Sequence, residues 1–583
     1  MNTSIASLIN NLNVWTSSVE RKSSGGRGGS KRINLYGIEC LRALIIDLAV
    51  RGKLVEQDPR DEPAAVTLAR IARAKKQKIE AAAARKSKTL ELLPTELPPL
   101  PNGWEWTQLR AICQINPSNS AEDLLRASFV PMALISNRVD GDHDTETVTW
   151  REIKKGFTHF AEGDVGIAKI TPCFENGKAA IFQNLENGIG AGTTELHVAR
   201  PWSDDVNRRY LLLTMKTASY LREGEARMTG TAGQKRVTRA YFEATPIPLP
   251  PLAEQQRIVI RVDELMALCD TLERDSAEAM SAHQTLVQAL LATLIDSADA
   301  TDLAANWSRM ESHFDSLFTT EASVNALKQT VLELAVRGKL VPQDQNDKPA
   351  SDLVRHTVQT KLSLIKNGQA TRDSVLAEVD KNDIPFGVPE SWAWARFPDL
   401  GILERGKSRH RPRNDPKLYQ PGIYPLVQTG EVARANGIID EFHSKYSELG
   451  LSQSKLWPKG TLCITIAANI ADAAILGFDA CFPDSVVGFI PAEPIASAEY
   501  FLHFMKTAKA DLLKFAPSTA QKNINLATLE TILIPIPPLN EMTRIIAKVD
   551  DLLTLCDSLK SRINEVAETQ KCLADTIIER AVA

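Results

Sequence analysis

The chain has 583 residues, of which 43% are hydrophobic and 24% charged, with a formal net charge of −4. This length accommodates several domains, and the charge excludes a uniformly basic protein but not a local basic surface. No apolar run approaches the ~20 residues that a membrane helix needs, and the first residues lack the pattern of a secretory signal. We therefore expect a cytoplasmic protein with no membrane partner, whose eight scattered cysteines are reduced thiols.

A repeated octapeptide indicates that the chain consists of two copies of one unit. LAVRGKLV occurs at Leu48–Val55 and again at Leu334–Val341, which chance does not produce in one chain. A helix is predicted after each copy, because Pro63 and Pro349 suit a first helical turn. The preceding stretch Ser23–Arg32, SSGGRGGSKR, is rich in glycine and has no counterpart in the second copy.

Each copy continues into a proline-stiffened boundary and a tryptophan pair, NGWEW at 102–106 and ESWAW at 390–394. The two copies then diverge, and similarity nearly vanishes between residues 109–226 and 400–513. Short apolar stretches separated by Gly, Asn, Asp and Pro predict mixed, strand-rich inserts in both. A helix is expected to close each insert, at 207–216 and 499–506.

Polar and basic side chains of the first insert are candidates for contact with nucleic acid, because such side chains bind phosphates and base edges. They are Lys169, Thr171, Asn176, Lys178, Arg227, Thr229 and Arg236. The pair Gln234-Lys235 recurs as Gln521-Lys522, and we expect these shared residues to set backbone register rather than to read sequence. The alternative is that such residues belong to the core or frame of each insert.

A long helix is predicted after each of the pairs Pro250-Pro251 and Pro537-Pro538, because apolar residues then alternate at spacings of four and three. The first seam holds Ile258, Val262, Leu265, Cys269, Leu272, Ser276, Ala279, His283, Leu286 and Leu290, and the second holds Ile545, Val549, Leu552, Cys556, Leu559, Ile563, Val566, Gln570, Leu573 and Ile577. Two such seams predict that the helices pair within the chain. The alternative is that each helix packs only on its own domain.

The second insert opens with a basic run and a motif that suggests a different function. Positive charges at alternate positions of this run favour a surface that contacts phosphates and guanine. The alternative is that the run is a solvated loop. The residues of the run are Arg405, Lys407, Arg409, Arg411 and Arg413. Asn469 is a further candidate, because asparagine reads adenine. Residues 401–408, GILERGKS, match the phosphate-loop pattern, but Pro412 and Pro416 deny the long helix that such a loop needs. No other catalytic set stands out.

The octapeptide, the TAGQK segment running into IPLPPLAEQQRI, and the Trp-initiated inserts resemble the specificity subunit of a type I restriction–modification system over essentially the whole chain. The resemblance implies two target-recognition domains that each read half of a split site in double-stranded DNA, held apart by an antiparallel coiled coil with pseudo-twofold symmetry. It also implies two methyltransferase subunits, which bind S-adenosylmethionine, and motor-nuclease subunits, which bind ATP and magnesium. This chain itself would be non-catalytic and without a cofactor.

The expected fold class is therefore α+β, with two mixed α/β recognition domains and long helices. We expect five segments: an N-terminal helical frame at 1–101, recognition domains at 102–250 and 392–537, a central helical segment at 251–391, and a C-terminal helix at 538–583. The competing hypotheses are a nucleotide hydrolase using Gly401–Ser408 and a pure assembly scaffold.

Overall fold

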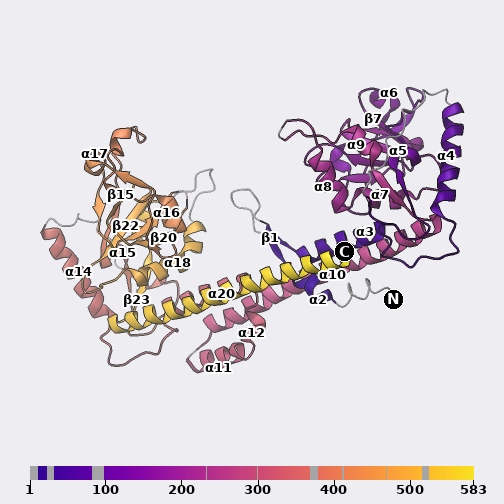
Figure 1. The fold of residues 1–583 in the computed structure, drawn as a ribbon. Helices are drawn as coiled ribbons and strands as arrows, with labels where there is room; N and C mark the ends of the chain where they lie inside the picture. Colours follow the sequence, from indigo (N-terminus) through magenta and orange to yellow (C-terminus); the bar gives the residue numbers. More distant parts are fainter. Residues whose placement is uncertain are drawn as a thin grey trace. The chain divides into compact units, whose positions relative to one another are not determined.

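The computed structural model describes residues 11–22, 32–81, 97–231, 233–298, 300–367, 379–409, 412–467, 469–514 and 524–582. The chain divides into two compact units, of which unit 1 holds Met1–Met280 and Glu565–Ala583 and unit 2 holds Ser281–Asn564. Each unit contains one copy of the repeat together with parts of both long helices (Figure 1). In the described ranges, no helix is long and apolar enough to cross a membrane.

Unit 1 is built from a helical frame and one insert. The frame elements are α2 (Leu12–Ser17), β1 (Glu20–Lys22), β2 (Arg32–Asn34), α3 (Tyr36–Val50), α4 (Ala64–Ala81), β3 (Glu105–Gln108), β12 (Pro246–Leu249) and the start of α10 (Leu252–Ile295). The insert elements are α5 (Leu109–Ile112), β4 (Cys113–Ile115), β5 (Arg126–Val130), β6 (Glu146–Thr149), α6 (Trp150–Ile153), β7 (Thr158–Ala161), β8 (Val165–Ala168), β9 (Ala179–Ile181), β10 (Ile189–Gly192), β11 (Leu196–Pro201), α7 (Arg208–Met215), α8 (Ala218–Ala226) and α9 (Arg239–Ala244).

Unit 2 repeats this plan. Its frame elements are α11 (Ala300–Glu311), α12 (Phe314–Leu317), α13 (Glu321–Val336), α14 (Ala350–Lys366), β13 (Ala393–Arg396), β23 (Leu533–Ile536) and the start of α20 (Leu539–Val582). Its insert elements are α15 (Phe397–Leu400), β14 (Gly401–Arg405), β15 (Tyr424–Leu426), α16 (Thr429–Arg434), β16 (Ile438–Ile439), β17 (Ser444–Tyr446), α17 (Glu448–Ser452), β18 (Leu456–Trp457), β19 (Leu462–Thr465), β20 (Ala473–Leu476), β21 (Ala480–Cys481), β22 (Val486–Pro491), α18 (Glu499–Lys514) and α19 (Leu526–Glu530).

The octapeptide is a helix stop in both copies. Gly52 and Gly338 have φ values of 67° and 69°, the left-handed conformation that glycine adopts after a helix C-terminus. The amide of the next lysine donates to the Leu48 or Leu334 carbonyl at 2.9 Å, which closes the last turn. A Cβ on Gly52 would lie 3.0 Å from the Trp104 ring, and one on Gly338 would lie 3.1 Å from the Trp392 ring. The repeat thus brings each helix end against the tryptophan that opens each insert.

Polar contacts at this junction are duplicated as well. The Trp104 indole N–H donates to the Glu254 carboxylate at 3.0 Å, and the Trp392 indole donates to Glu541 at 3.1 Å. Burial raises the pKa of each carboxyl, although the indole and a glutamine amide act in the opposite direction. Further pairs repeat in the same places: Gln57–Glu254 and Gln343–Glu541, Arg257–Asp61 and Arg544–Asp347, Arg42–Asp270 and Lys328–Asp557. Each frame therefore holds its insert and long helix by the same interactions.

The two inserts share the order of their corresponding strands although their sequences do not match, and the second insert adds the edge strand β16. One sheet has the order β4-β11-β8-β9 in unit 1 and β14-β22-β19-β20-β16 in unit 2. The other has the order β6-β5-β10-β7 in unit 1 and β17-β15-β21-β18 in unit 2, with its central pair parallel in both. The mixed, strand-rich structure predicted for both inserts is confirmed, and the expected closing helices are present as α7 and α18.

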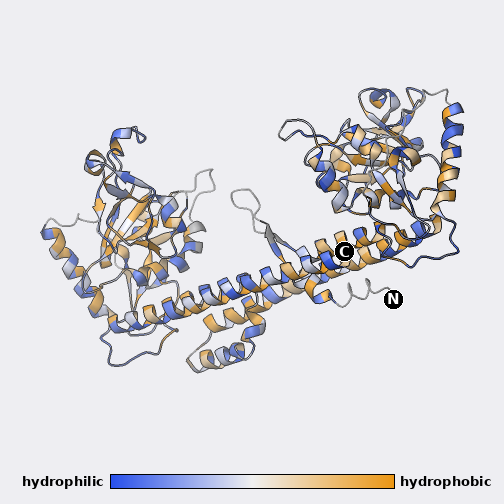
Figure 2. Cartoon of the chain, viewed as in Figure 1, coloured by the Kyte–Doolittle hydropathy of each residue, from blue (hydrophilic) through white to orange (hydrophobic). Residues whose placement is uncertain are grey.

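Both long helices form where they were expected, immediately after the Pro-Pro pairs. Ile258, Val262 and Cys269 are buried on α10, as are Ile545, Val549 and Cys556 on α20. In unit 1 a single hydrophobic cluster contains α10 residues and Ala574 of α20; in unit 2 another contains Val287 and Leu291 of α10 with α20 residues. Each helix therefore buries one part of its length in each unit, and Figure 2 shows apolar and polar residues alternating along both.

Beyond Ser276 and Ile563 the predicted seam is wrong at alternate positions only, because Leu290 and Ile577 still pack against the apolar clusters. Leu286 is 51% exposed, Leu573 is 48% exposed and Val566 is 56% exposed, whereas Val287 and Ala574 are buried. At these positions the buried residue is the next one along each helix, at the same point of the repeat, whereas His283 and Gln570 remain half-buried as predicted. A straight helix has 3.6 residues per turn, so a strict seven-residue pattern drifts around it, and an extra spacing of four corrects the drift.

Candidate nucleic-acid interface

The first-insert candidates lie on two loops that pair with each other. The β8–β9 loop spans residues 169–178, and the loop between α8 and α9 contains residues 227–237. The Thr171 amide donates to the Lys235 carbonyl at 3.0 Å, and the Val237 amide donates to the Lys169 carbonyl at 2.8 Å. The structure therefore brings together the candidates Thr171 and Lys235, which lie 64 residues apart in the chain.

Three of these candidates are engaged within the insert. The Arg236 guanidinium makes two hydrogen bonds of 2.9 Å to Glu195 and holds the pKa of that carboxyl below its usual value. The Lys178 ammonium donates to the Met132 carbonyl at 2.9 Å. The Thr171 hydroxyl donates to Glu175 at 2.7 Å. Such contacts shape the loops and reduce the freedom of these side chains to bind DNA.

The other candidates face outward. Asn176, Thr229, Gln234 and Lys235 are exposed, and Lys169 is half-buried. Arg227 is also exposed, and its guanidinium lies 5.5 Å from the centre of the Tyr241 ring. Together they form a surface with cationic and amide groups, the types that bind phosphates and base edges.

Lys216 lies behind this surface and is absent from the sequence-derived candidates. It follows α7, is 8% exposed, and donates from Nζ to the carbonyls of Asn137, Arg138 and Gly177. Burial lowers the pKa of its ammonium to about 7. The recurrence of Met215-Lys216 as Met505-Lys506 was the available sequence signal, but it could not show which carbonyls the side chain meets.

The basic run of the second insert turns out of the sheet. Arg405 ends β14, and its guanidinium donates to the Asp484 carbonyl. Arg413 makes two hydrogen bonds of 2.9 Å to the Asp484 carboxylate. Lys407 is half-buried and Arg409 is exposed, whereas Arg411 lies outside the described residues. Asp484 thus accepts hydrogen bonds from Arg405 and Arg413, at the two ends of the run, so the arginines do not continue along a single strand.

Asn469 lies on the β19–β20 loop, which corresponds to the β8–β9 loop of the first insert. Its side-chain amide points to the Thr429 carbonyl at 3.5 Å, and the residue is exposed. The Ile524 amide donates to the Ile466 carbonyl at 3.0 Å, repeating the Val237–Lys169 contact. Gln521 and Lys522 lie outside the described residues.

The phosphate-loop match is not supported by the structure. Gly401–Arg405 form β14, which pairs with β22 along its whole length, and Gly406 donates from its amide to Val486. The next helical turn in the described part of the chain is η4 (Pro416–Leu418), which is too short to present a phosphate-binding N-terminus. Residues 401–405 therefore form an edge strand, and residues 401–408 do not make a nucleotide cradle.

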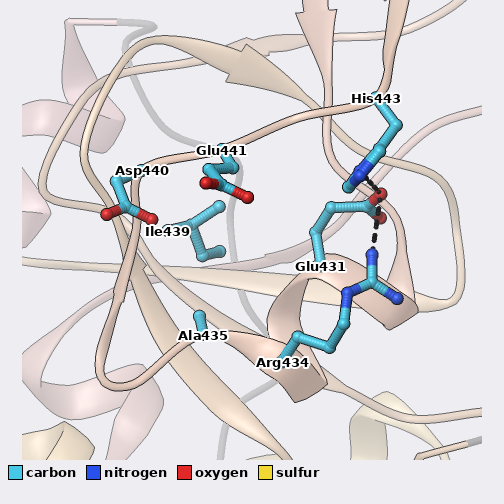
Figure 3. A pocket seen from close by; sticks show the side chains of 7 residues that line it. All are labelled: Glu431, Arg434, Ala435, Ile439, Asp440, Glu441 and His443. Carbon is cyan, nitrogen blue, oxygen red and sulfur yellow. Dashed lines mark hydrogen bonds and ion pairs between the residues drawn. The ribbon is translucent and has the colours of Figure 1, made fainter.

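A small cavity of about 60 Å³ lies beside α16 (Figure 3). Glu431 occupies its wall, 3.0 Å from His443 Nδ1 and 3.3 Å from Arg434, and Asp440 and Glu441 also line it. Its carboxylates disfavour phosphate binding, because like charges repel. Over the described ranges, no group of three or more His, Cys, Asp or Glu residues is placed to hold a metal ion.

Comparison with known proteins gives consistent matches. Residues 101–280 and 389–569 match the family described as type I restriction modification DNA specificity domain. The chain is 42% identical over 591 residues to the type I restriction enzyme EcoAI specificity subunit of Escherichia coli, and 41% identical over 592 residues to the EcoEI specificity subunit of Escherichia coli; each match covers 99% of both chains. A solved chain from a study of type I restriction–modification assembly superposes with a TM-score of 0.51 at 18% identity, covering 84% of this chain and 99% of that chain, a likeness of fold.

Proposed function

Because this chain belongs to the type I restriction–modification specificity subunits, we propose that its two inserts each read one half of a bipartite site in double-stranded DNA. The observation that carries this proposal is the matching order of the corresponding strands in the two inserts, with β16 as an additional edge strand in unit 2, combined with unrelated loop sequences. Two inserts with similar sheets but different surface side chains can each recognise a different base sequence. The recognition domains are proposed to span residues 102–250 and 392–537.

The β8–β9 and β19–β20 loops are the proposed reading elements. Asn176 and Asn469 are assigned to base edges, since asparagine can pair with adenine through two hydrogen bonds. Lys169, Arg227, Lys235 and Arg409 are assigned mainly to phosphates. We assign Lys178, Arg236 and Arg413 to loop support, because each is already held by a carbonyl or carboxylate.

The long helices are proposed to form an antiparallel intramolecular coiled coil that sets the distance between the readers. Support comes from their membership of the units: α10 begins in unit 1 and ends in unit 2, whereas α20 begins in unit 2 and ends in unit 1. Burial of an apolar stripe along both helices also fits pairing. The matching contacts of the two frames support pseudo-twofold symmetry.

The duplicated frames are proposed to dock two methyltransferase subunits. Leu268 and Leu555, and likewise Leu286 and Leu573, are exposed at corresponding positions of the two copies, which suits two identical partners. Motor-nuclease subunits would complete the complex, with S-adenosylmethionine, ATP and magnesium bound by the partners. This chain would supply recognition and assembly but no reacting group.

The test is to express the full chain with its methyltransferase partner and to map methylated adenines in the DNA of the cells. The expected result is one motif with two short specified parts separated by a fixed number of unspecified base pairs. Half-site centres about one helical turn apart, ~34 Å, would let both readers approach from one side. A single continuous motif would contradict the bipartite proposal, and unselective methylation would favour a scaffold with decayed readers.

A further inference from the structure

We propose that Lys216 is a positioning residue for DNA recognition, which holds Asn176 in place from behind the β8–β9 loop without touching DNA. The inference rests on the proposed function of that loop and adds a residue that acts through it. Asn176 is exposed, and its side chain has no hydrogen-bond partner among the residues that the structure describes. A free amide reads a base only if its backbone is fixed, because misplacement breaks paired hydrogen bonds.

The backbone around Asn176 is anchored on both sides. Its own amide donates to the Pro172 carbonyl at 3.1 Å, and the carbonyl of Gly177 accepts from Lys216 Nζ at 2.9 Å. Gly177 has a φ of 67°, so the chain turns sharply directly after Asn176. The Lys178 ammonium then ties the end of the loop to Met132.

Lys216 also connects the loop to a second segment. Its ammonium donates to the carbonyls of Arg138 at 2.5 Å and Asn137 at 3.3 Å, so that all three N–H groups have acceptors. The next carbonyl, that of Val139, accepts from Arg209, whose guanidinium also pairs with Asp263 of α10 at 2.9 Å. A continuous set of contacts therefore runs from the long helix through residues 137–139 to the loop that bears Asn176.

Among its described residues, the second insert does not repeat this set of contacts, although Lys506 occupies the position of Lys216. Glu499 occupies the position of Arg209, and the β19–β20 loop is instead held by an ion pair between Lys509 and Asp472. Loss of the Lys216 ammonium should therefore affect only the half-site that the first insert reads. An effect on this half-site alone distinguishes a positioning role of Lys216 from a general loss of folding, which would affect both half-sites.

The experiment uses the full chain assembled with its methyltransferase subunits. Methylation rates are measured on the mapped site and on sites with single base-pair changes in either half, for the wild type, Lys216→Met, Lys216→Arg, Asn176→Ala and the charge control Lys155→Met. The first half is defined as the half that changes when residues 109–226 are exchanged. Lys155 is exposed in the same insert.

We expect Lys216→Met to lose discrimination in the first half by about tenfold, the value of one good paired base contact, and to keep it in the second half. Lys216→Arg should restore most of the loss, because it retains cationic N–H donors, and Lys155→Met should resemble the wild type. If Lys216→Met does not fold, Lys216→Gln, which is shorter and uncharged, gives the same test.

Other outcomes overturn the inference in distinguishable ways. If Asn176→Ala relaxes the first half and Lys216→Met does not, the loop reads DNA and Lys216 has no positioning role. If neither variant changes discrimination, the assignment of the loop to DNA recognition is itself wrong. If Lys216→Met slows methylation of all sites equally, Lys216 acts only on stability.

Discussion

Replacing His503 with leucine should stabilise the protein. His503 lies on α18, is 4% exposed, and neither ring nitrogen has a hydrogen-bond partner in the described part of the chain. Its Nε2 lies 3.4 Å from the Asp550 carboxylate, which forms an ion pair only with a protonated ring. The corresponding residue of the first copy is Leu213, which is completely buried. Leucine is thus already accepted at this place in the fold.

The magnitude follows from two effects. A buried polar group without a partner costs about 1 to 3 kcal/mol, which leucine removes. Burial also lowers the pKa of His503 from its ordinary 6.5 to about 4. Between these pH values the unfolded chain binds a proton that the folded chain does not, so folding stability falls as the pH falls. At pH 5 this loss amounts to about 2 kcal/mol, because one pH unit corresponds to about 1.4 kcal/mol.

The assay is thermal unfolding of the full chain at pH 7.5 and pH 5.0. His503→Leu should raise the unfolding temperature at both values, and more at pH 5.0, by about 1 to 2 °C for each kcal/mol, because the unfolding entropy grows with the size of the unit that unfolds. Leu213→His, the reciprocal change, should lower it. The pKa of His197 is likewise lowered to about 4, so the comparison with the wild type isolates the contribution of His503. An unchanged or lower unfolding temperature for His503→Leu would show that the buried imidazole does not destabilise the fold.

Three further predictions concern the junction and the proposed interface. Trp104→Phe should destabilise the chain by about 2 kcal/mol in urea unfolding, because the buried Glu254 carboxylate loses the indole donor; unchanged stability would show that the contact contributes nothing. Lys235→Ala should weaken DNA binding and reduce the slope of log K against log salt concentration by about 0.9, the value for one phosphate contact, whereas an unchanged slope would remove Lys235 from the interface. Lys407→Ala should leave ATP hydrolysis by the purified chain at background, because residues 401–405 form a strand; hydrolysis that this variant abolishes would revive the nucleotide-hydrolase hypothesis.

The repeat made the frame predictable. Residues such as Gly52, Trp104 and their counterparts recur together because each is needed for one junction, and the structure shows them in contact. The seam positions at Leu286 and Leu573 were predicted wrongly, because both residues are apolar and fit a seven-residue pattern. Only the accumulated rotation of a 3.6-residue helix moves them to the surface.

The interaction partners of the candidate site residues could not be predicted from the sequence. The partners of Arg236 and Arg413 are Glu195 and Asp484, which lie 41 and 71 residues away along the chain. No local pattern shows that the fold brings these charges together. The shared strand order of the inserts could not be predicted either. Strand pairing tolerates many different side chains, so the two insert sequences retain little similarity.

Exchange of one insert between two related chains shows whether each insert reads its half-site independently. Residues 109–226 are replaced with the corresponding segment of the EcoAI specificity subunit, and methylated adenines are mapped for the chimaera and both parents. If each insert reads DNA independently on a fixed frame, the chimaera should combine one half-site from each parent and keep a constant gap. A motif in which both halves change, or neither does, would contradict the account.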